Sequence, residues 1–322
     1  MRIRRCELKD GTITIVTYKN GQWLSLKPIV EEHNLDVSSI LHLLKFYKNN
    51  ADLTTNFVNT IAHPADINKF LPPLKPLSLR GFMLWEKHFM AAKRGLIALS
   101  KPSFFSLMKW FLNPDKKPSI LKPPPMFYKA PIYYMGNHLQ AYFDSQEIQY
   151  PSYTQWLDFE AEIGIIIIKK VRNIQETYEA EEAIGGFLIV NDFSARDMQI
   201  QEFKESLFGP VVKAKNFATG FSYDVATPDE IISNFNNLTA KIYINNTLVV
   251  EGSTSESQYQ PADMVKYASL EETLYPGEIL STGTIPNCCA IEHFPEKNLF
   301  LKKGDNIKIE INKIGTSENT IS

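Results

Sequence analysis

The 322-residue chain has an ordinary globular composition, with 44% hydrophobic and 22% charged residues, so it can bury a sizeable core. Its net charge of −2 argues against a sequence-independent nucleic-acid binder, which needs an excess of clustered Lys and Arg. No stretch holds the ~18 apolar residues of a membrane span, and the basic start "MRIRRC" is not followed by the apolar run of a signal peptide. Because the chain has only three cysteines, a reduced, cytoplasmic protein is expected.

The first part of the chain predicts a small N-terminal α/β domain over residues 1–75. Turn signals at Gly11 and Gly21 separate short strand patterns, and residues 38–49 have the pattern of a helix. The Pro-rich stretch 71–78 predicts a linker at the end of this domain.

Residues 76–125 are expected to form a linker, a lid helix and an insertion. The helix is predicted over 79–95, because aromatic residues recur at helical spacing and Gly95 is a plausible end. The insertion, 96–125, is apolar in its first half and Pro-rich in its second. A segment packed on the body of the protein or on a partner subunit is favoured. The alternative is a helix on a membrane surface, because Lys101 flanks aromatic residues.

From residue 126 to 322 the pattern changes to strands and turns, which predicts an α+β, mostly β domain built as a mixed β-roll or barrel. A helix is expected around 175–184, ended by the glycine pair 185–186. Strands are expected at 159–168, 186–191, 239–244, 247–251, 278–282 and 305–311.

Two acids stand just before the most apolar run of the chain, in "DFEAEIGIIII". Alternate side chains of a strand share a face, so Glu160 and Glu162 point the same way and repel each other. A solvent-facing strand would make this pair harmless. The adjoining run, however, looks buried on both faces, and a bound cation would remove the conflict. Carboxylate oxygens suit Mg²⁺, Ca²⁺ or Mn²⁺.

A second polar cluster follows a second apolar strand, in "GGFLIVNDFSARDMQ". Asp192 emerges at the end of the strand, where sites are commonly built, and Arg196 and Gln199 follow at once. An ion pair between Arg196 and Asp197 on the surface is the alternative reading. The repetition of a polar cluster after an apolar strand favours a third metal-binding acid at Asp192.

Five motifs in order resemble the fumarylacetoacetate hydrolase family: "DFEAEIG", "NDFSARDMQ", "GPVVKAKNFATG", "LYPGEILSTGT" and "LKKGDNIKIEI". The resemblance covers 126–322 and extends to 79–95. It implies a mixed β-roll fold, a divalent metal, a small keto-acid substrate and a dimer. It also implies a set of site residues: metal-binding Glu160, Glu162 and Asp192; substrate-binding Arg196, Gln199, Thr219 and Thr284; catalytic Lys215; and a water-activating pair, His88 and Glu292.

Each catalytic residue of this set also has a simpler interpretation. His88 could be a half-exposed helix residue, Lys215 a surface residue, and Glu292 a partner of the adjacent His293. If the helix that carries His88 is a lid, His88 can lie far from Glu292 until substrate binds.

The chain departs from the family pattern at two positions. Hydrolase members place an aspartate metal ligand seven residues before the histidine, where this chain has Gly81. The position often occupied by tyrosine two residues later is Met83. Three carboxylates remain, and Mg²⁺ commonly keeps several waters, so three can suffice.

The resemblance therefore implies a metal-dependent hydrolase of a carbon–carbon bond in a β-diketo acid or acylpyruvate. The alternative within enzymes is a decarboxylase, tautomerase or hydratase of 2-keto acids, of the oxaloacetate or 2-keto-4-pentenoate type, because enolate chemistry serves all of them. An alternative of another class is a non-catalytic binder of a metal or a small acid with a decayed site. A cysteine nucleophile at Cys288 or Cys289 is the weakest hypothesis, because buried cysteine is more common.

Overall fold

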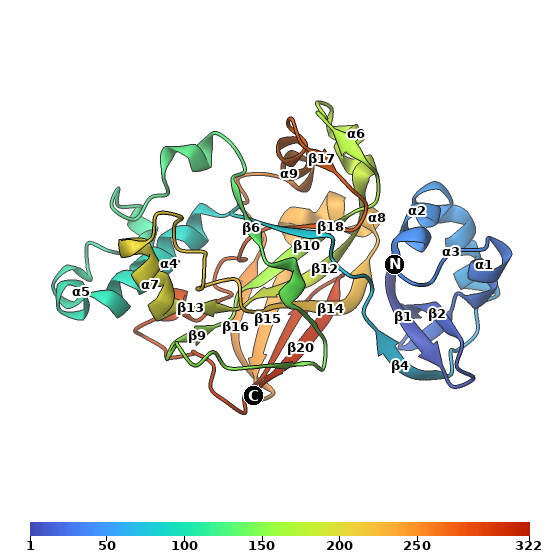
Figure 1. Cartoon of the computed structure of the whole chain (residues 1–322), viewed down its shortest axis with the longest axis horizontal. Coiled ribbons are helices and arrows are strands. Elements are labelled where there is room, and N and C mark those ends of the chain that lie inside the picture. The colour runs from blue at the N-terminus through green and yellow to red at the C-terminus, as the bar shows by residue number, and fades with distance from the viewer.

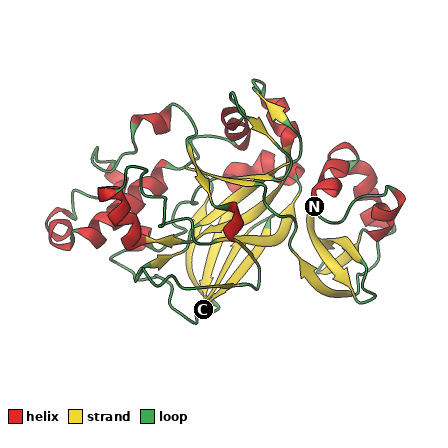
Figure 2. Ribbon diagram, viewed as in Figure 1, coloured by secondary structure: helices red, strands yellow, loops and turns green.

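The computed structural model describes residues 1–322 and shows two β-sheets surrounded by helices (Figures 1 and 2). The larger sheet has eleven strands, which are in spatial order β3 (Gln22–Ser25), β2 (Ile13–Lys19), β1 (Arg2–Leu8), β14 (Thr219–Ala226), β12 (Ile184–Asp192), β10 (Ala161–Ile167), β18 (Glu278–Ser281), β5 (Ser78–Phe82) and β6 (Tyr133–Gly136), with β4 (Ile67–Leu71) beside β1 and β7 (Ala141–Phe143) beside β14.

The smaller sheet has five strands, in the order β16 (Thr247–Ser253), β15 (Thr239–Ile244), β19 (Asn306–Ile311), β20 (Gly315–Ile321) and β8 (Glu147–Ile148). Two short pairs complete the strands: β11 (Val171–Arg172) with β17 (Thr273–Leu274), and β9 (Leu157–Asp158) with β13 (Ser194–Ala195). Strands β14 and β20 lie against each other, and one buried cluster contains Ile189 of β12 and Ile309 of β19. Neither sheet closes on itself, so the fold is the expected mixed roll and not a barrel.

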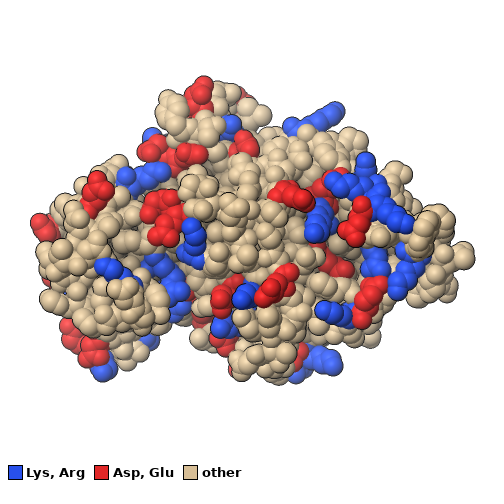
Figure 3. Space-filling view, turned by 180° about the vertical axis from the view of Figure 1, so that it is seen from behind, with Lys and Arg blue, Asp and Glu red and all other residues tan.

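The helices lie around the sheets, and none of them combines the length and the apolar character that crossing a membrane requires. They are α1 (Lys27–Glu32), α2 (Leu41–Asn49), α3 (Ala51–Thr60), α4 (Glu86–Ser100), α5 (Pro102–Met108), α6 (Thr177–Ala183), α7 (Arg196–Glu205), α8 (Pro228–Ile231) and α9 (Pro261–Ala268), with 3₁₀ helices η1 (Pro114–Lys116), η2 (Pro125–Tyr128), η3 (His138–Gln140), η4 (Ile232–Asn237) and η5 (Ile291–His293). On the face in Figure 3, acidic and basic side chains are interspersed, as expected for a chain with little net charge.

Strand β10 forms because its apolar run is buried on both faces, between β12 and β18. Strand β12 is longer than the sequence predicted, since the glycine pair lies inside it and does not end helix α6. A Cβ at Gly185 would lie 2.1 Å from a methyl group of Ile168, and one at Gly186 would crowd Val225. These glycines are therefore needed for close packing and not for a helix cap.

The N-terminal strands belong to the same sheet as the rest of the chain. Strand β1 pairs with β14 through Arg2 and Ile3, which face Ala226 and Val225. In Figure 1 the N-terminal helices lie to one side of this junction. The division into segments 1–75, 76–125 and 126–322 stays a prediction.

The helix expected over 79–95 was wrong at both ends. Residues 78–82 form β5, which pairs in parallel with β18 and places Leu79 opposite Ile279. Short apolar patterns do not distinguish a strand from a helix, and a partner 200 residues away decided this one. The helix itself, α4, begins at Glu86 and continues to Ser100, so that Gly95 lies inside it.

The insertion 96–125 packs partly on the body of the protein. Phe105, Leu112 and Leu121 are buried against Met90 of α4. Leu107, Trp110 and other large side chains of the insertion stay exposed. This agrees with the favoured interpretation, a segment packed on the body.

Gly95 lets helix α4 approach η5 very closely. A Cβ at this position would lie 1.9 Å from the carbonyl oxygen of Ile291, a distance that no real contact reaches. Glycine is otherwise unfavourable inside a helix, so its presence here has a packing reason.

We expect Gly95→Ala to destabilise the protein by about 1–2 kcal/mol, because overpacking outweighs the gain of about 1 kcal/mol in helix propensity. Chemical denaturation of both proteins measures the difference. A variant that is more stable than the wild type would contradict the close approach of α4 and η5.

Candidate active site

Three buried carboxylates converge at the end of two neighbouring strands. Glu160 precedes β10, Glu162 lies within it, and Asp192 ends β12, which pairs with β10. An oxygen of each acid lies within 4.8 Å of the others, and none of the three residues is more than 5% exposed. The structure thus brings together the acids that the strand pattern singled out.

Two buried cations hold these acids. The Arg196 guanidinium donates to Glu160 Oε1 at 2.6 Å and to Asp158 Oδ2 at 2.7 Å. The Lys215 ammonium donates to Glu160 Oε2 and, at 2.9 Å, to Asp192 Oδ2. Neither residue is the surface residue that the simpler interpretations allowed, because both are at least 93% buried.

The pKa values of the acids follow from this arrangement. Burial opposes the ionisation of Glu160, but Lys215 and Arg196 outweigh it and hold the pKa of Glu160 below its usual range. Burial, followed by the charges of Asp192 and Glu160, raises the pKa of Glu162 well above its usual range. Burial also raises the pKa of Asp192, although Lys215 opposes the shift.

The residues present fit a divalent cation. Four buried carboxylates, including Asp158, face two buried cations and leave two formal negative charges uncompensated. Asp192 Oδ1 is buried without a hydrogen-bond donor, and Glu162 accepts only from Ser281, through Oε2. Unpaired carboxylate oxygens of this kind are ligands for a hard cation, so Glu160, Glu162 and Asp192 could hold one. Its identity does not follow from the donor set.

A cavity of about 300 Å³ opens onto the acids. Gln199 and Thr284, which the family resemblance implies as substrate-binding residues, line this cavity. Gln199 accepts a hydrogen bond from Arg196, and the hydroxyl of Thr284 is buried without a partner. Thr219 does not line the cavity. It pairs with Asp192 through the β12–β14 ladder and could act only through that residue.

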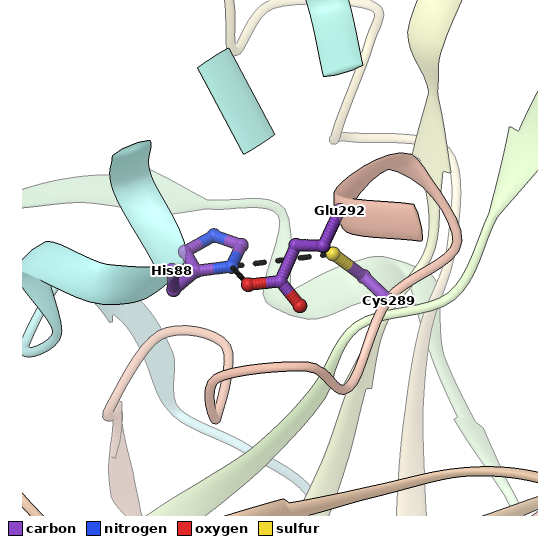
Figure 4. Close-up of side chains that lie close together, drawn as sticks. All are labelled: His88, Cys289 and Glu292. Atoms are coloured by element: carbon purple, nitrogen blue, oxygen red, sulfur yellow. Dashed lines mark hydrogen bonds and ion pairs between the residues drawn. The ribbon is translucent and has the colours of Figure 1, made fainter. Parts of the chain in front are cut away.

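His88 and Glu292 form a hydrogen-bonded pair (Figure 4). His88 Nδ1 lies 3.0 Å from Glu292 Oε1, and both side chains are almost completely buried. The pair is therefore formed without substrate, contrary to the expectation for a lid helix. Glu292 also does not pair with His293, whose ring contacts the backbone oxygen of Asn287. His88 lines the cavity of the acids, and its Nε2 makes no hydrogen bond to the protein.

The sequence did not predict the role of Asp158. This fully buried acid accepts from Arg196 and from the backbone N–H groups of Ala290 and Ile291, at 2.6 and 3.0 Å. It thereby fixes η5, which carries Glu292, relative to Arg196. The sequence did hold a signal for Asp158, because it stands two residues before Glu160 and alternate residues of a strand lie on the same face.

Tyr134 was also missed, and no local pattern marks it. Its hydroxyl donates to Asp192 Oδ2 at 2.8 Å. A Cβ at Gly81 would lie 2.4 Å from the Tyr134 ring, so this ring takes the space in front of the position where family members place an aspartate. Burial and the charges of Asp192 and Glu162 raise the pKa of Tyr134 well above its usual range, so it stays a neutral donor. Met83 lines the same cavity and offers no hydrogen bond from its thioether.

Comparison with known proteins agrees with this geometry. Residues 111–322 match the family model described as "Fumarylacetoacetate (FAA) hydrolase C-terminal", and the chain belongs to the fumarylacetoacetate hydrolase family. A mitochondrial oxaloacetate tautomerase from Xenopus laevis is 28% identical over 275 residues, which cover 80% of this chain and 82% of that protein. A 4-hydroxyphenylacetate degradation bifunctional isomerase/decarboxylase from Salmonella dublin is 28% identical over 207 residues, which are 62% of this chain and 42% of that protein.

Solved structures support the fold alone, because their sequence identities are low. A fumarylacetoacetate hydrolase from Exiguobacterium antarcticum has a TM-score of 0.67 at 20% identity, covering 100% of this chain and 99% of that one. A maleylpyruvate hydrolase from Sphingobium has a TM-score of 0.65 at 14% identity, with coverage of 100% and 99%. These relatives and structures carry the names of different reactions, so membership defines an enzyme of this family without defining its reaction.

We expect Glu162→Gln to change stability in two opposite ways. Because the pKa of Glu162 is raised in the folded state, its ionisation destabilises folding as pH rises above the ordinary carboxyl range. The glutamine variant lacks this penalty, so with a chelator present it should be more stable than the wild type at pH 7. At pH 4 the difference in stability between the two proteins should be smaller.

The same variant should lose the stabilisation that a bound cation provides. Wild type at 100 times the dissociation constant of Mg²⁺ should gain about 2.7 kcal/mol, and the variant much less. Thermal unfolding with and without Mg²⁺ measures both effects. Glu272→Gln is the control, since this acid pairs with Arg80 away from the cluster. An equal Mg²⁺ effect in Glu162→Gln and wild type would contradict the site.

We expect Tyr134→Phe to weaken Mg²⁺ binding about 10–100-fold, as is usual when a ligand loses its outer hydrogen-bond partner. Calorimetric titration with Mg²⁺ measures the change. Tyr133→Phe serves as the matched control, because its hydroxyl contacts Arg80 and Glu272 and not the acid cluster. If both variants bind Mg²⁺ equally, Tyr134 does not orient Asp192.

Proposed function

We propose that this protein is a metal-dependent enzyme that moves a proton within a small 2-keto dicarboxylic acid, as a keto–enol tautomerase of the oxaloacetate type. The observation that carries the proposal is the pre-formed His88–Glu292 pair beside the acid cluster. Such a pair supplies a base without any water in the reaction. The names of the oxaloacetate tautomerases that match most of the chain support the same choice.

The cavity supports a small substrate with a second acid group. Its volume, about 300 Å³, is at the lower end for ligand sites. Among its cations, Arg196 and Lys215 are already paired with carboxylates. Lys93 also lines the cavity and forms no ion pair, and burial lowers its pKa. Lys93 is therefore the residue that we assign to the far carboxylate of the substrate.

The base acts through the two nitrogens of one ring. An ionised Glu292 can only accept a hydrogen bond, so Nδ1 of His88 carries the proton and Nε2 is free to accept one. Nε2 takes a proton from the carbon next to the keto group, and Glu292 stabilises the imidazolium that forms. His88 then returns the proton to the keto oxygen, which completes the tautomerisation with no net gain or loss.

A divalent cation held by Glu160, Glu162 and Asp192 would supply Lewis-acid stabilisation of the negative charge that develops on oxygen. Arg196 and Lys215 keep Glu160 ionised and in place for this role. Thr284, whose buried hydroxyl has no partner in the protein, is placed to donate a hydrogen bond to a substrate oxygen.

The second candidate function is hydrolysis of a carbon–carbon bond in an acylpyruvate or β-diketo acid. The same His88–Glu292 pair favours it, because Nε2 could instead take a proton from a water molecule. The hydroxide would attack the carbonyl, and the carbon–carbon bond would break with its electrons left on the pyruvate fragment as an enolate. This enolate would take back the proton held by His88, giving pyruvate and a carboxylic acid. The two candidates share every residue and differ in whether a water enters the reaction.

We expect His88→Ala to lower turnover about 10²–10⁴-fold, the usual contribution of a general base. Its Mg²⁺-dependent gain in melting temperature should match that of the wild type, because the acids are untouched. His293→Ala is the matched control and should retain turnover, since its ring lies outside the cavity. Full turnover of His88→Ala would remove His88 from the mechanism.

The choice between the two functions follows from a panel of substrates assayed with Mg²⁺ and with Mn²⁺. Faster decay of the oxaloacetate enol, with no cleavage of acylpyruvates, supports the tautomerase. Release of pyruvate from an acylpyruvate supports the hydrolase.

A further inference from the structure

A second group of metal-ligating atoms lies behind the acid cluster. His88 Nδ1, Cys289 Sγ and an oxygen of Glu292 lie within 4.8 Å of one another, and all three residues are buried (Figure 4). His88 Nδ1 is 3.0 Å from Glu292 Oε1 and 4.0 Å from Cys289 Sγ. Ligand atoms around a tetrahedral zinc ion, at 2.0–2.3 Å from the metal, stand about 3.3–3.6 Å apart, so small rotations of side chains would suffice.

One carboxylate oxygen of Glu292 has no partner in the protein, which indicates a ligand. Its Oε2 is buried and has no hydrogen-bond partner, which is costly for a carboxylate. The Cys289 thiol contacts only His88 Nδ1 among possible partners. A bound cation would satisfy both groups together.

The chemistry of the three donors selects the metal. A thiolate, an imidazole and one carboxylate suit zinc, whereas Mg²⁺ and Ca²⁺ require oxygen ligands. A divalent ion with one thiolate and one carboxylate forms a neutral centre, which a buried site tolerates. Burial and the charge of Glu292 raise the pKa of the Cys289 thiol well above its usual range, so zinc must displace its proton, as it does for other coordinating thiols.

Through Glu292 the group also borders a second space, apart from the substrate cavity. Glu292 borders a hollow of about 1090 Å³ between α4 and the insertion, which is lined also by Met90, Arg94 and Trp110. His88, by contrast, lines the cavity of the acid cluster. The His88–Glu292 pair thus lies between the substrate cavity and the larger hollow, from which we expect an ion to enter.

We propose that His88, Cys289 and Glu292 form an inhibitory zinc site. Zinc bound through Nδ1 takes the place of the hydrogen bond to Glu292 and requires the ring proton to move from Nδ1 to Nε2. A protonated Nε2 cannot accept a proton from the substrate. The binding of zinc stands on geometry alone, whereas its effect on turnover rests on the proposed role of His88 as the base.

The test uses Co²⁺ as a spectroscopic substitute for zinc, added to the full chain in excess Mg²⁺. One equivalent of Co²⁺ should produce a thiolate-to-cobalt charge-transfer band in the near ultraviolet, and Zn²⁺ should remove it. Cobalt on the acid cluster cannot give this band, because that cluster has no sulfur. Cys289→Ser should abolish the band and weaken Zn²⁺ binding about 10–100-fold. Glu292→Gln should weaken Zn²⁺ binding by a similar factor.

Cys288→Ser is the matched control, because the adjacent Cys288 sulfur packs against Gly252 and is no member of the group. It should keep the band. Circular dichroism checks that each variant folds, and anomalous scattering at the zinc edge from wild-type crystals locates the ion without any variant. Absence of the band in folded wild type, its persistence in Cys289→Ser, or zinc found elsewhere would overturn the site.

Turnover assays then separate this proposal from the proposed function. Zn²⁺ should inhibit wild type and Cys288→Ser, while Cys289→Ser keeps its turnover and resists inhibition. A cobalt–thiolate band without zinc inhibition would support the site and overturn inhibition through His88. Loss of turnover in His88→Ala without any such band would support the proposed function and overturn the zinc site.

Discussion

Two buried cations hold together a group of carboxylates that would otherwise repel one another. Arg196 and Lys215 together contact Asp158, Glu160 and Asp192, and they supply two positive charges against four negative ones when Glu162 is included. A divalent cation would supply the two missing charges, and burial together with the charges of Asp192 and Glu160 raises the pKa of Glu162 well above its usual range. The strands β10 and β12 can therefore end in acids although both are buried in the core.

The acid cluster and the base are connected through Asp158 and Gly95. Asp158 accepts from Arg196 on one side and from the backbone at the start of η5 on the other. Gly95 removes the side chain that would keep α4 away from the same 3₁₀ helix. These two contacts hold α4 and η5 together, so that His88 and Glu292 lie at hydrogen-bond distance in the structure without substrate.

The His88–Glu292 pair lies between two spaces, because His88 lines one and Glu292 lines the other. His88 lines the smaller cavity together with Lys93 and the acid cluster. Glu292 lines the larger hollow between α4 and the insertion, and the buried Cys289 Sγ lies 4.0 Å from His88 Nδ1. The insertion 96–125 thus forms one wall of the hollow beside Glu292, in addition to packing on the body.

By itself the sequence determined the acid cluster, because strand alternation is local: it puts Glu160 and Glu162 on one face whatever surrounds them. Motif order likewise identified the family and the roll. Only the tertiary structure decided the contacts of Tyr134 and the pairing of Asp158 with Arg196. It also decided the hydrogen bond between His88 and Glu292, which are 204 positions apart. Such contacts depend on how distant segments pack, as does the strand at 78–82, which pairs with β18. No local periodicity encodes that packing, and this is the physical reason that the sequence missed it.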